Sequence, residues 1–146
     1  YGILVIHWGS LNQIMKQICG DTMDILVLED DPPIADFIAE ALRDEGYNPH
    51  VAHTVSTAIA AIENSIPQLI LLDLNIPTTH ESNAFLAYWR SSSAHGVPII
   101  LITASSRVPA LELLGVSGFL VKPFDLTDLF DHVKQYIGTR SPSISP

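Results

Sequence analysis

The chain has 146 residues, of which 47% are hydrophobic and 16% are charged, and its formal net charge at pH 7 is −9. This length and composition predict one globular domain with a sizeable core and exclude a disordered chain. Only seven Lys and Arg residues are present. We therefore expect no direct binding of nucleic acid, because neutralising phosphates requires a basic face.

The single cysteine, Cys19, excludes an internal disulfide framework and favours a cytoplasmic location. No apolar run is long enough to cross a bilayer, so we expect no membrane partner. The first residues lack the basic start of a signal peptide and differ in pattern from the rest. We expect an N-terminal extension of uncertain origin over 1–22, a folded domain over 23–138 and a flexible Pro/Ser-rich tail over 139–146.

Within the expected domain, strand and helix patterns alternate five times. The apolar run Ile25–Leu28 predicts the first strand. Asp31 can cap the next helix, whose first turn holds two prolines, where a missing backbone N–H costs nothing. Gly46 follows the end of this helix. Apolar residues at helical spacing predict its buried stripe: Ile34, Phe37, Ile38, Ala41 and Leu42.

The second strand, Asn48–Ala52, contains Pro49, which cannot donate to a sheet ladder, so this strand is predicted at the edge. Thr54 can cap a helix that runs to about Asn64. Val55, Ala58, Ile59 and Ile62 are predicted to face inward from it.

The remaining elements follow the same alternation. Apolar runs predict strands at Leu69–Asp73, Pro98–Thr103 and Gly118–Val121. Helices are predicted from about Ser82 to Ser92 (with Phe85, Leu86 and Trp89 apolar), over about Val108–Leu114 and over Asp125–Ile137 (with Leu126, Leu129, Phe130, Val133 and Ile137 apolar).

This alternation predicts an α/β fold: a five-stranded parallel sheet with helices on both faces. An edge position for the second strand fits the doubly wound order 2-1-3-4-5. In that order the first and third strands are neighbours at a topological switch point, where such sheets bind ligands.

Polar side chains follow four of the predicted strands. Glu29 and Asp30 follow the first strand, Asp73 ends the third, Thr103 ends the fourth and Lys122 follows the fifth. Clustered carboxylates repel one another unless a positive charge joins them, and an oxygen-rich site suits Mg²⁺. With a lysine and a hydroxyl beside them, these groups suit phosphoryl transfer to the Asp73 carboxylate.

Four segments carry a resemblance to a known family. They read Leu-Glu-Asp-Asp-Pro at 28–32, Leu-Leu-Asp-Leu-Asn-Ile-Pro at 71–77, Ile-Thr-Ala at 102–104 and Val-Lys-Pro-Phe at 121–124. In this order, each at a strand end, they resemble the receiver domain of two-component response regulators. The resemblance covers residues 24–137 and implies the flavodoxin-like, CheY-like fold.

The resemblance implies that Asp73 is the phosphoacceptor for a sensor histidine kinase or a phosphotransfer protein. It implies a Mg²⁺ (or Mn²⁺) site made by Glu29, Asp30, Asp73 and the backbone carbonyl of Asn75. The chain would then be a signalling receiver, not an enzyme, and would promote only its own phosphorylation and dephosphorylation.

The resemblance also implies roles around the phosphoryl group. Thr103, Ala104 and Lys122 would contact it, and Ala104 is small enough to leave it room. Thr103 and Phe119 would form the switch, and the Lys122-Pro123 bond is a candidate cis peptide, which proline tolerates. The output face, also a candidate homodimer surface, would comprise the fourth helix, fifth strand and fifth helix and would bind a downstream protein.

Two departures from the family pattern leave an alternative open. The segment 78–83 lacks the usual glycine, and the segment 103–115 is short and contains Pro109, so the fourth helix should be short or displaced. The alternative is a phosphate-independent interaction module on the same fold.

Three further assignments rest on ordinary structural roles. Phe119 could be a core residue rather than a switch, and Asp31 is a helix cap rather than a metal ligand. His50 and His53 are interpreted as surface or edge residues, since the six histidines lack any compact metal-binding spacing.

Overall fold

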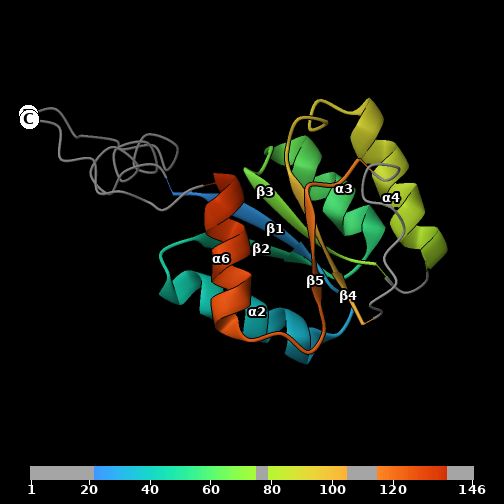
Figure 1. Cartoon of the computed structure of the whole chain (residues 1–146). Coiled ribbons are helices and arrows are strands. Elements are labelled where there is room, and N and C mark those ends of the chain that lie inside the picture. The colour runs from blue at the N-terminus through green and yellow to red at the C-terminus, as the bar shows by residue number, and fades with distance from the viewer. Residues whose placement is uncertain (1–21, 75–78, 105–114, 138–146) are drawn as a thin grey trace, which may run out of the picture.

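The computed structural model describes residues 22–74, 79–104 and 115–137, and these ranges hold one five-stranded parallel sheet. The strand order is β2-β1-β3-β4-β5, as predicted (Figure 1). The elements are β1 (Asp24–Leu28), α2 (Pro32–Asp44), β2 (Asn48–Ala52), α3 (Val55–Asn64), β3 (Leu69–Asp73), α4 (Thr79–Ser91), β4 (Ile99–Thr103), β5 (Gly118–Val121) and α6 (Leu126–Ile137).

Each face of the sheet is covered by a pair of helices, α2 with α6 on one side and α3 with α4 on the other (Figure 1). Alternate strand residues point to opposite faces. Leu26, Ile70 and Leu101 therefore pack with α3 and α4, whereas Ile25, Leu71 and Ile100 pack with α2 and α6.

The central strands are buried on both faces, which explains their continuous apolar sequences. Every residue of β3 and β4 is buried, including the polar residues at their ends, Asp73 and Thr103. Burial of each Leu or Ile side chain contributes about 1.5–3 kcal/mol. The polar residues at the ends of β3 and β4 are therefore held by fully buried strands.

The predicted cap at Thr54, before α3, is confirmed, and the predicted cap at Asp31, before α2, is wrong. The Thr54 side chain accepts a hydrogen bond from the Thr57 N–H, and the two residues form a reciprocal capping box before α3. Asp31 stands at the N-cap of α2 but makes no side-chain capping bond. A cap side chain bonds the second or third helical N–H, and Pro33 removes one of these two donors.

Two further predictions about helices need correction. Phe37 is 52% exposed, so it does not belong to the buried stripe of α2. The other predicted residues Ile38, Ala41 and Leu42 are buried, and Ile34 is partly buried. The helix expected from Ser82 begins at Thr79. Its predicted apolar residues Phe85, Leu86 and Trp89 are buried.

Some predictions concern residues outside the described ranges. These are the extension over 1–22 apart from its last residue, the segment around Asn75, the helix over 108–114 and the tail over 139–146. The division into three segments stays a prediction.

Candidate functional site

The acidic residues meet because β1 and β3 are neighbours in register. Leu28 pairs with Leu72, so the two chains deliver Glu29 and Asp73 side by side at the carboxyl edge of the sheet. One carboxylate oxygen each from Glu29, Asp30 and Asp73 lies within 4.8 Å of the others. Glu29 is 2% exposed and Asp73 6% exposed, whereas Asp30 lies at the surface.

Lys122 directly follows the edge strand β5, and its side chain reaches the two buried acids. Its Nζ lies 3.2 Å from Oε2 of Glu29 and 3.5 Å from Oδ2 of Asp73. Its backbone N–H donates to the Thr103 carbonyl at 2.7 Å, which continues the β4–β5 ladder past the end of β5. The Lys122-Pro123 peptide bond is cis.

One ammonium group does not offset the two buried carboxylates. The pKa of Glu29 is raised above its ordinary value, first by burial and second by the charge of Asp73, although Lys122 acts in the opposite direction. An added cation would relieve this excess of negative charge.

The three carboxylates fit a hard divalent cation. Mg²⁺ prefers oxygen ligands and commonly takes one or two carboxylates while it keeps several waters. A cluster with two buried carboxylates and a third at the surface suits such a partly hydrated ion. Asn75, the expected carbonyl ligand, lies outside the described residues.

The remaining predicted residues lie on β4 and β5. Thr103 is 1% exposed and pairs with Val121, and Ala104 next to it is exposed. Phe119 is 39% exposed, so the core interpretation of this residue is wrong. It borders a hollow of about 530 Å³ lined by residues 117–121 of the β5 segment and by Asp128, His132 and Tyr136 of α6.

Two residues that the sequence analysis did not assign to the site hold its backbone. The Ser82 hydroxyl, fully buried, donates to the Asp73 carbonyl at 3.1 Å. The spacing of Ser82 with Phe85, Leu86 and Trp89 is that of one helix face and could have indicated its burial. The Nδ1 of His53 lies 2.9 Å from the Glu29 carbonyl oxygen, and no sequence pattern signals this contact.

Comparison with known proteins decides the family. The response regulator receiver domain family matches residues 25–134. The chain belongs to this family. In fold it is similar to chemotaxis protein CheY4 of Vibrio cholerae, with a TM-score of 0.73 and 24% identity over 80% of this chain and 99% of that one. A CheY-like receiver from Methanospirillum hungatei gives a TM-score of 0.71 with 26% identity over 79% and 93% of the two chains.

Full-length relatives of this receiver are larger. The transcriptional regulatory protein PmrA of Pectobacterium parmentieri is 34% identical over 79% of this chain, and the phosphate regulon regulator PhoB of Escherichia coli is 30% identical over 81%. The chain spans about half the length of these relatives, 52% and 53%. These relatives are named as transcriptional regulators, and their names do not test whether this chain binds nucleic acid. The absence of nucleic-acid binding therefore stays a prediction.

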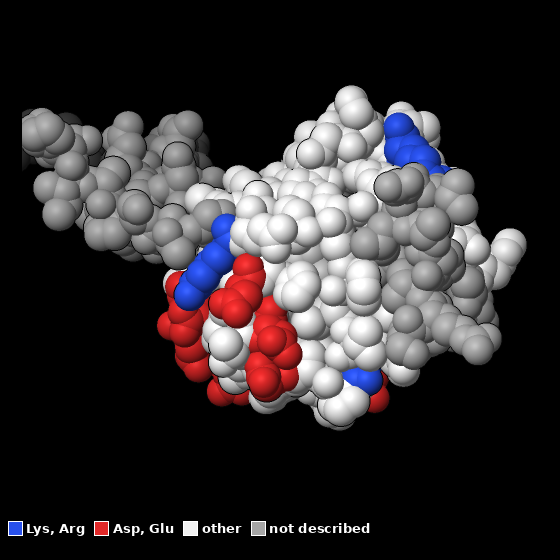
Figure 2. Space-filling model, in the orientation of Figure 1, with Lys and Arg blue, Asp and Glu red and all other residues white. Residues whose placement is uncertain are grey.

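The surface of the receiver carries its acidic residues unevenly. Figure 2 shows Asp and Glu side chains gathered over α2 and α6. Exposed acids on these helices include Asp36, Glu40 and Asp44 on α2 with Asp128 and Asp131 on α6. Among the described residues, no helix has the length and apolar character that crossing a membrane requires.

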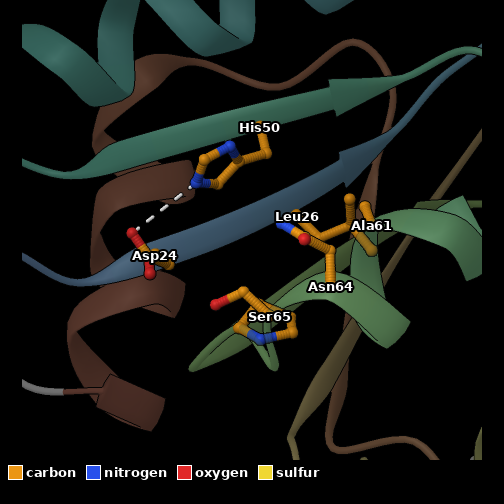
Figure 3. A pocket seen from close by; sticks show the side chains of 7 residues that line it. Asp24, Leu26, His50, Ala61, Asn64 and Ser65 are labelled. Atoms are coloured by element: carbon orange, nitrogen blue, oxygen red, sulfur yellow. Dashed lines mark ion pairs between the residues drawn. The ribbon is translucent and has the colours of Figure 1, made fainter. Parts of the chain in front are cut away.

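The opposite end of the sheet holds a second polar cluster, where β1 begins. A hollow of about 80 Å³ is lined by Asp24, His50 and Asn64 among others (Figure 3). The Nε2 of His50 lies 3.6 Å from Oδ1 of Asp24, which also accepts a hydrogen bond from Asn48 at 2.7 Å. None of the predicted site residues lies in this hollow.

Proposed function

We propose that this receiver accepts a phosphoryl group on Asp73 from a histidine kinase or a phosphotransfer protein, with Mg²⁺ (or Mn²⁺) bound. The carrying observation is the cluster of three carboxylates with the Lys122 ammonium between the two buried ones. Membership of the receiver family supports the same reading.

In the proposed reaction, a carboxylate oxygen of Asp73 forms a bond to phosphorus. The bond from phosphorus to the donor's histidine nitrogen breaks, and that nitrogen keeps the bonding electron pair. Lys122 Nζ lies close enough to Asp73 to stabilise the negative charge of the transferred phosphoryl oxygens. Thr103 and Ala104 would flank the phosphoryl group from the end of β4.

Glu29, Asp30 and Asp73, with the Asn75 carbonyl, would hold the metal ion. When bound, Mg²⁺ supplies positive charge that stabilises the phosphoryl oxygens and offsets the carboxylates. The raised pKa of Glu29 supports this assignment, because burial first and the charge of Asp73 second disfavour its ionised form, and a bound cation would favour it.

Output would run from Thr103 to β5 and α6. Val121 pairs with Thr103, and Phe119, two residues earlier, stands half-exposed beside the hollow against α6. We propose that phosphorylation changes the orientation of the Phe119 side chain and so alters the surface formed by β5 and α6. A downstream protein or a second receiver would bind this surface.

The alternative, a phosphate-independent interaction module, was suggested by the segments 78–83 and 103–115. Residue 78 and residues 105–114 lie outside the described ranges, and residues 79–83 begin α4. No contact among the described residues favours this alternative over the phosphoacceptor.

The test is intact mass after incubation with acetyl phosphate, with and without Mg²⁺, for the wild type and Asp73→Asn. We expect a Mg²⁺-dependent phosphoryl adduct on the wild type, formed as acetate leaves, and none on the variant. A folded wild type that gains no adduct would favour the alternative, and a labelled Asp73→Asn would show that another residue accepts the phosphoryl group.

A further inference from the structure

The backbone hydrogen-bond ladder between β1 and β2 stops one bond early at the end of β2. Leu28 pairs with Ala52, and the Glu29 N–H donates to the Ala52 carbonyl at 3.0 Å. In a continuing parallel ladder, the Glu29 carbonyl would next accept from the backbone N–H of Thr54. That N–H instead donates to the Thr57 hydroxyl at 3.2 Å, within the capping box of α3.

A side chain occupies the place of this missing donor. His53 Nδ1 lies 2.9 Å from the Glu29 carbonyl oxygen. A carbonyl oxygen can only accept, so Nδ1 carries the hydrogen and donates. The imidazole thus completes the β1–β2 ladder at the point where β2 turns into a helix.

The bond fixes the peptide that joins the two acids at the end of β1. The Glu29 N–H and C=O are both held by the β2 side, and Oε1 of Glu29 accepts from the Asp31 N–H at 3.3 Å. Asp30, the exposed member of the carboxylate cluster, lies between these fixed points. Its backbone direction therefore depends on the orientation of the Glu29 carbonyl.

We propose that His53 is a positioning residue for the metal site. Its Nδ1–H takes the place of the Thr54 backbone N–H, which bonds within the α3 cap instead. The His53 bond thereby holds the Glu29–Asp30 peptide in the orientation that brings both carboxylates to the cation. This inference rests on the proposed function, because it concerns the same carboxylates. His53 itself touches neither the ion nor the phosphoryl group.

The test compares Mg²⁺ affinity by isothermal titration calorimetry in the full chain for the wild type, His53→Leu and His53→Asn. The amide nitrogen of asparagine can occupy the position of Nδ1 and donate the same bond, whereas leucine cannot. His53→Leu should raise the dissociation constant about tenfold, and His53→Asn should stay within about threefold of the wild type. At saturating Mg²⁺, phosphorylation of His53→Leu by acetyl phosphate should return to within about twofold of the wild-type rate.

His95→Leu is the matched control, since His95 Nδ1 also contacts a backbone carbonyl, that of Ser92 at 2.9 Å, away from the site. Urea unfolding of each variant separates loss of fold from loss of affinity. Wild-type affinity in His53→Leu, equal weakening by leucine and asparagine, or equal weakening in His95→Leu would overturn the inference while the proposed function stands. A folded wild type that binds no Mg²⁺ and gains no phosphoryl group would overturn both.

Discussion

The two ends of this sheet hold similar residue types but differ in how deeply their acids are buried and in the partners of those acids. At the amino end, Asp24 has one exposed histidine and one amide partner, and its side chain is 19% exposed (Figure 3). At the carboxyl end, Glu29 and Asp73 are buried with one lysine between them, and the pKa of Glu29 is raised by burial and by Asp73.

This difference separates a structural cluster from a candidate functional one. Acidic and basic residues together do not define a site, because surface ion pairs are common in proteins and contribute little to stability. Two buried carboxylates that share one ammonium group leave a net negative charge, and a buried acid whose pKa is raised marks a candidate functional site. Three predictions test whether the two ends differ in this way.

The largest effect is expected from Lys122→Ala. This variant removes the cation beside the transferred phosphoryl group and should slow phosphorylation by acetyl phosphate about 10²-fold. It also leaves Glu29 and Asp73 without a counter-charge and should lower the free energy of unfolding by about 3 kcal/mol without Mg²⁺. Initial rates of adduct formation and urea unfolding measure the two effects.

Lys134→Ala is the control for that prediction, because Lys134 is an exposed lysine on α6. It should leave both quantities near the wild-type values. If Lys122→Ala phosphorylates as fast as Lys134→Ala, the carboxyl end does not use its lysine as proposed.

Intermediate effects of opposite sign are expected when each end loses one acid. Asp73→Asn removes a like charge beside Glu29 and should raise the free energy of unfolding by about 1 kcal/mol without Mg²⁺. Asp24→Asn weakens the contacts with Asn48 and His50 and should lower it by about 0.5 kcal/mol. Urea unfolding compares the two variants with the wild type.

Repeating those unfolding experiments with Mg²⁺ sharpens the contrast. At tenfold excess over its dissociation constant, Mg²⁺ should stabilise the wild type and Asp24→Asn by about 1.4 kcal/mol. Asp73→Asn should gain much less. Equal stabilisation of all three proteins would place the cation elsewhere.

The smallest effect is the pH dependence of stability caused by Glu29. Because the folded pKa of Glu29 lies above its ordinary value of 4.5, the folded protein keeps this proton where the unfolded chain has released it. The contribution to stability is therefore complete below pH 4.5 and is lost as the pH rises through the raised pKa.

Glu29→Gln should remove this component, so its stability relative to the wild type should increase as the pH rises from 4.5 towards neutrality without Mg²⁺. Glu63→Gln, at an exposed position on α3, should follow the wild type. Urea unfolding across this pH range measures the difference, and parallel curves for wild type and Glu29→Gln would contradict the assigned charge imbalance.

The fold was predictable because its signals are local. Apolar runs such as Leu69–Leu72 reflect strands buried on both faces, and Pro49 indicated the edge position of β2. The position of Phe37 was not predictable, because helical periodicity defines a stripe but does not say which flank the sheet covers. The missing Asp31 cap was also not predictable from its residue type alone, since a cap bonds the second or third helical N–H and Pro33 removes one of these two donors.

The acids and the lysine of the site were predictable because each follows an apolar strand. The contacts that hold their backbone were not. His53 acts on Glu29 only because β2 ends in register with β1 at that point, and register is a tertiary property. Ser82 contacts the Asp73 carbonyl because α4 packs close to the end of β3, and the sequence alone does not give this packing.

The central claim is that the phosphoryl group is carried by Asp73. Borohydride reduction of the protein after treatment with acetyl phosphate and Mg²⁺ converts an acyl phosphate to an alcohol, and peptide mass spectrometry then locates the modified residue. The account predicts homoserine at position 73 and unmodified aspartate at positions 24 and 30. Reduction at another position, with Asp73 intact in a folded protein that carries phosphate, would contradict it.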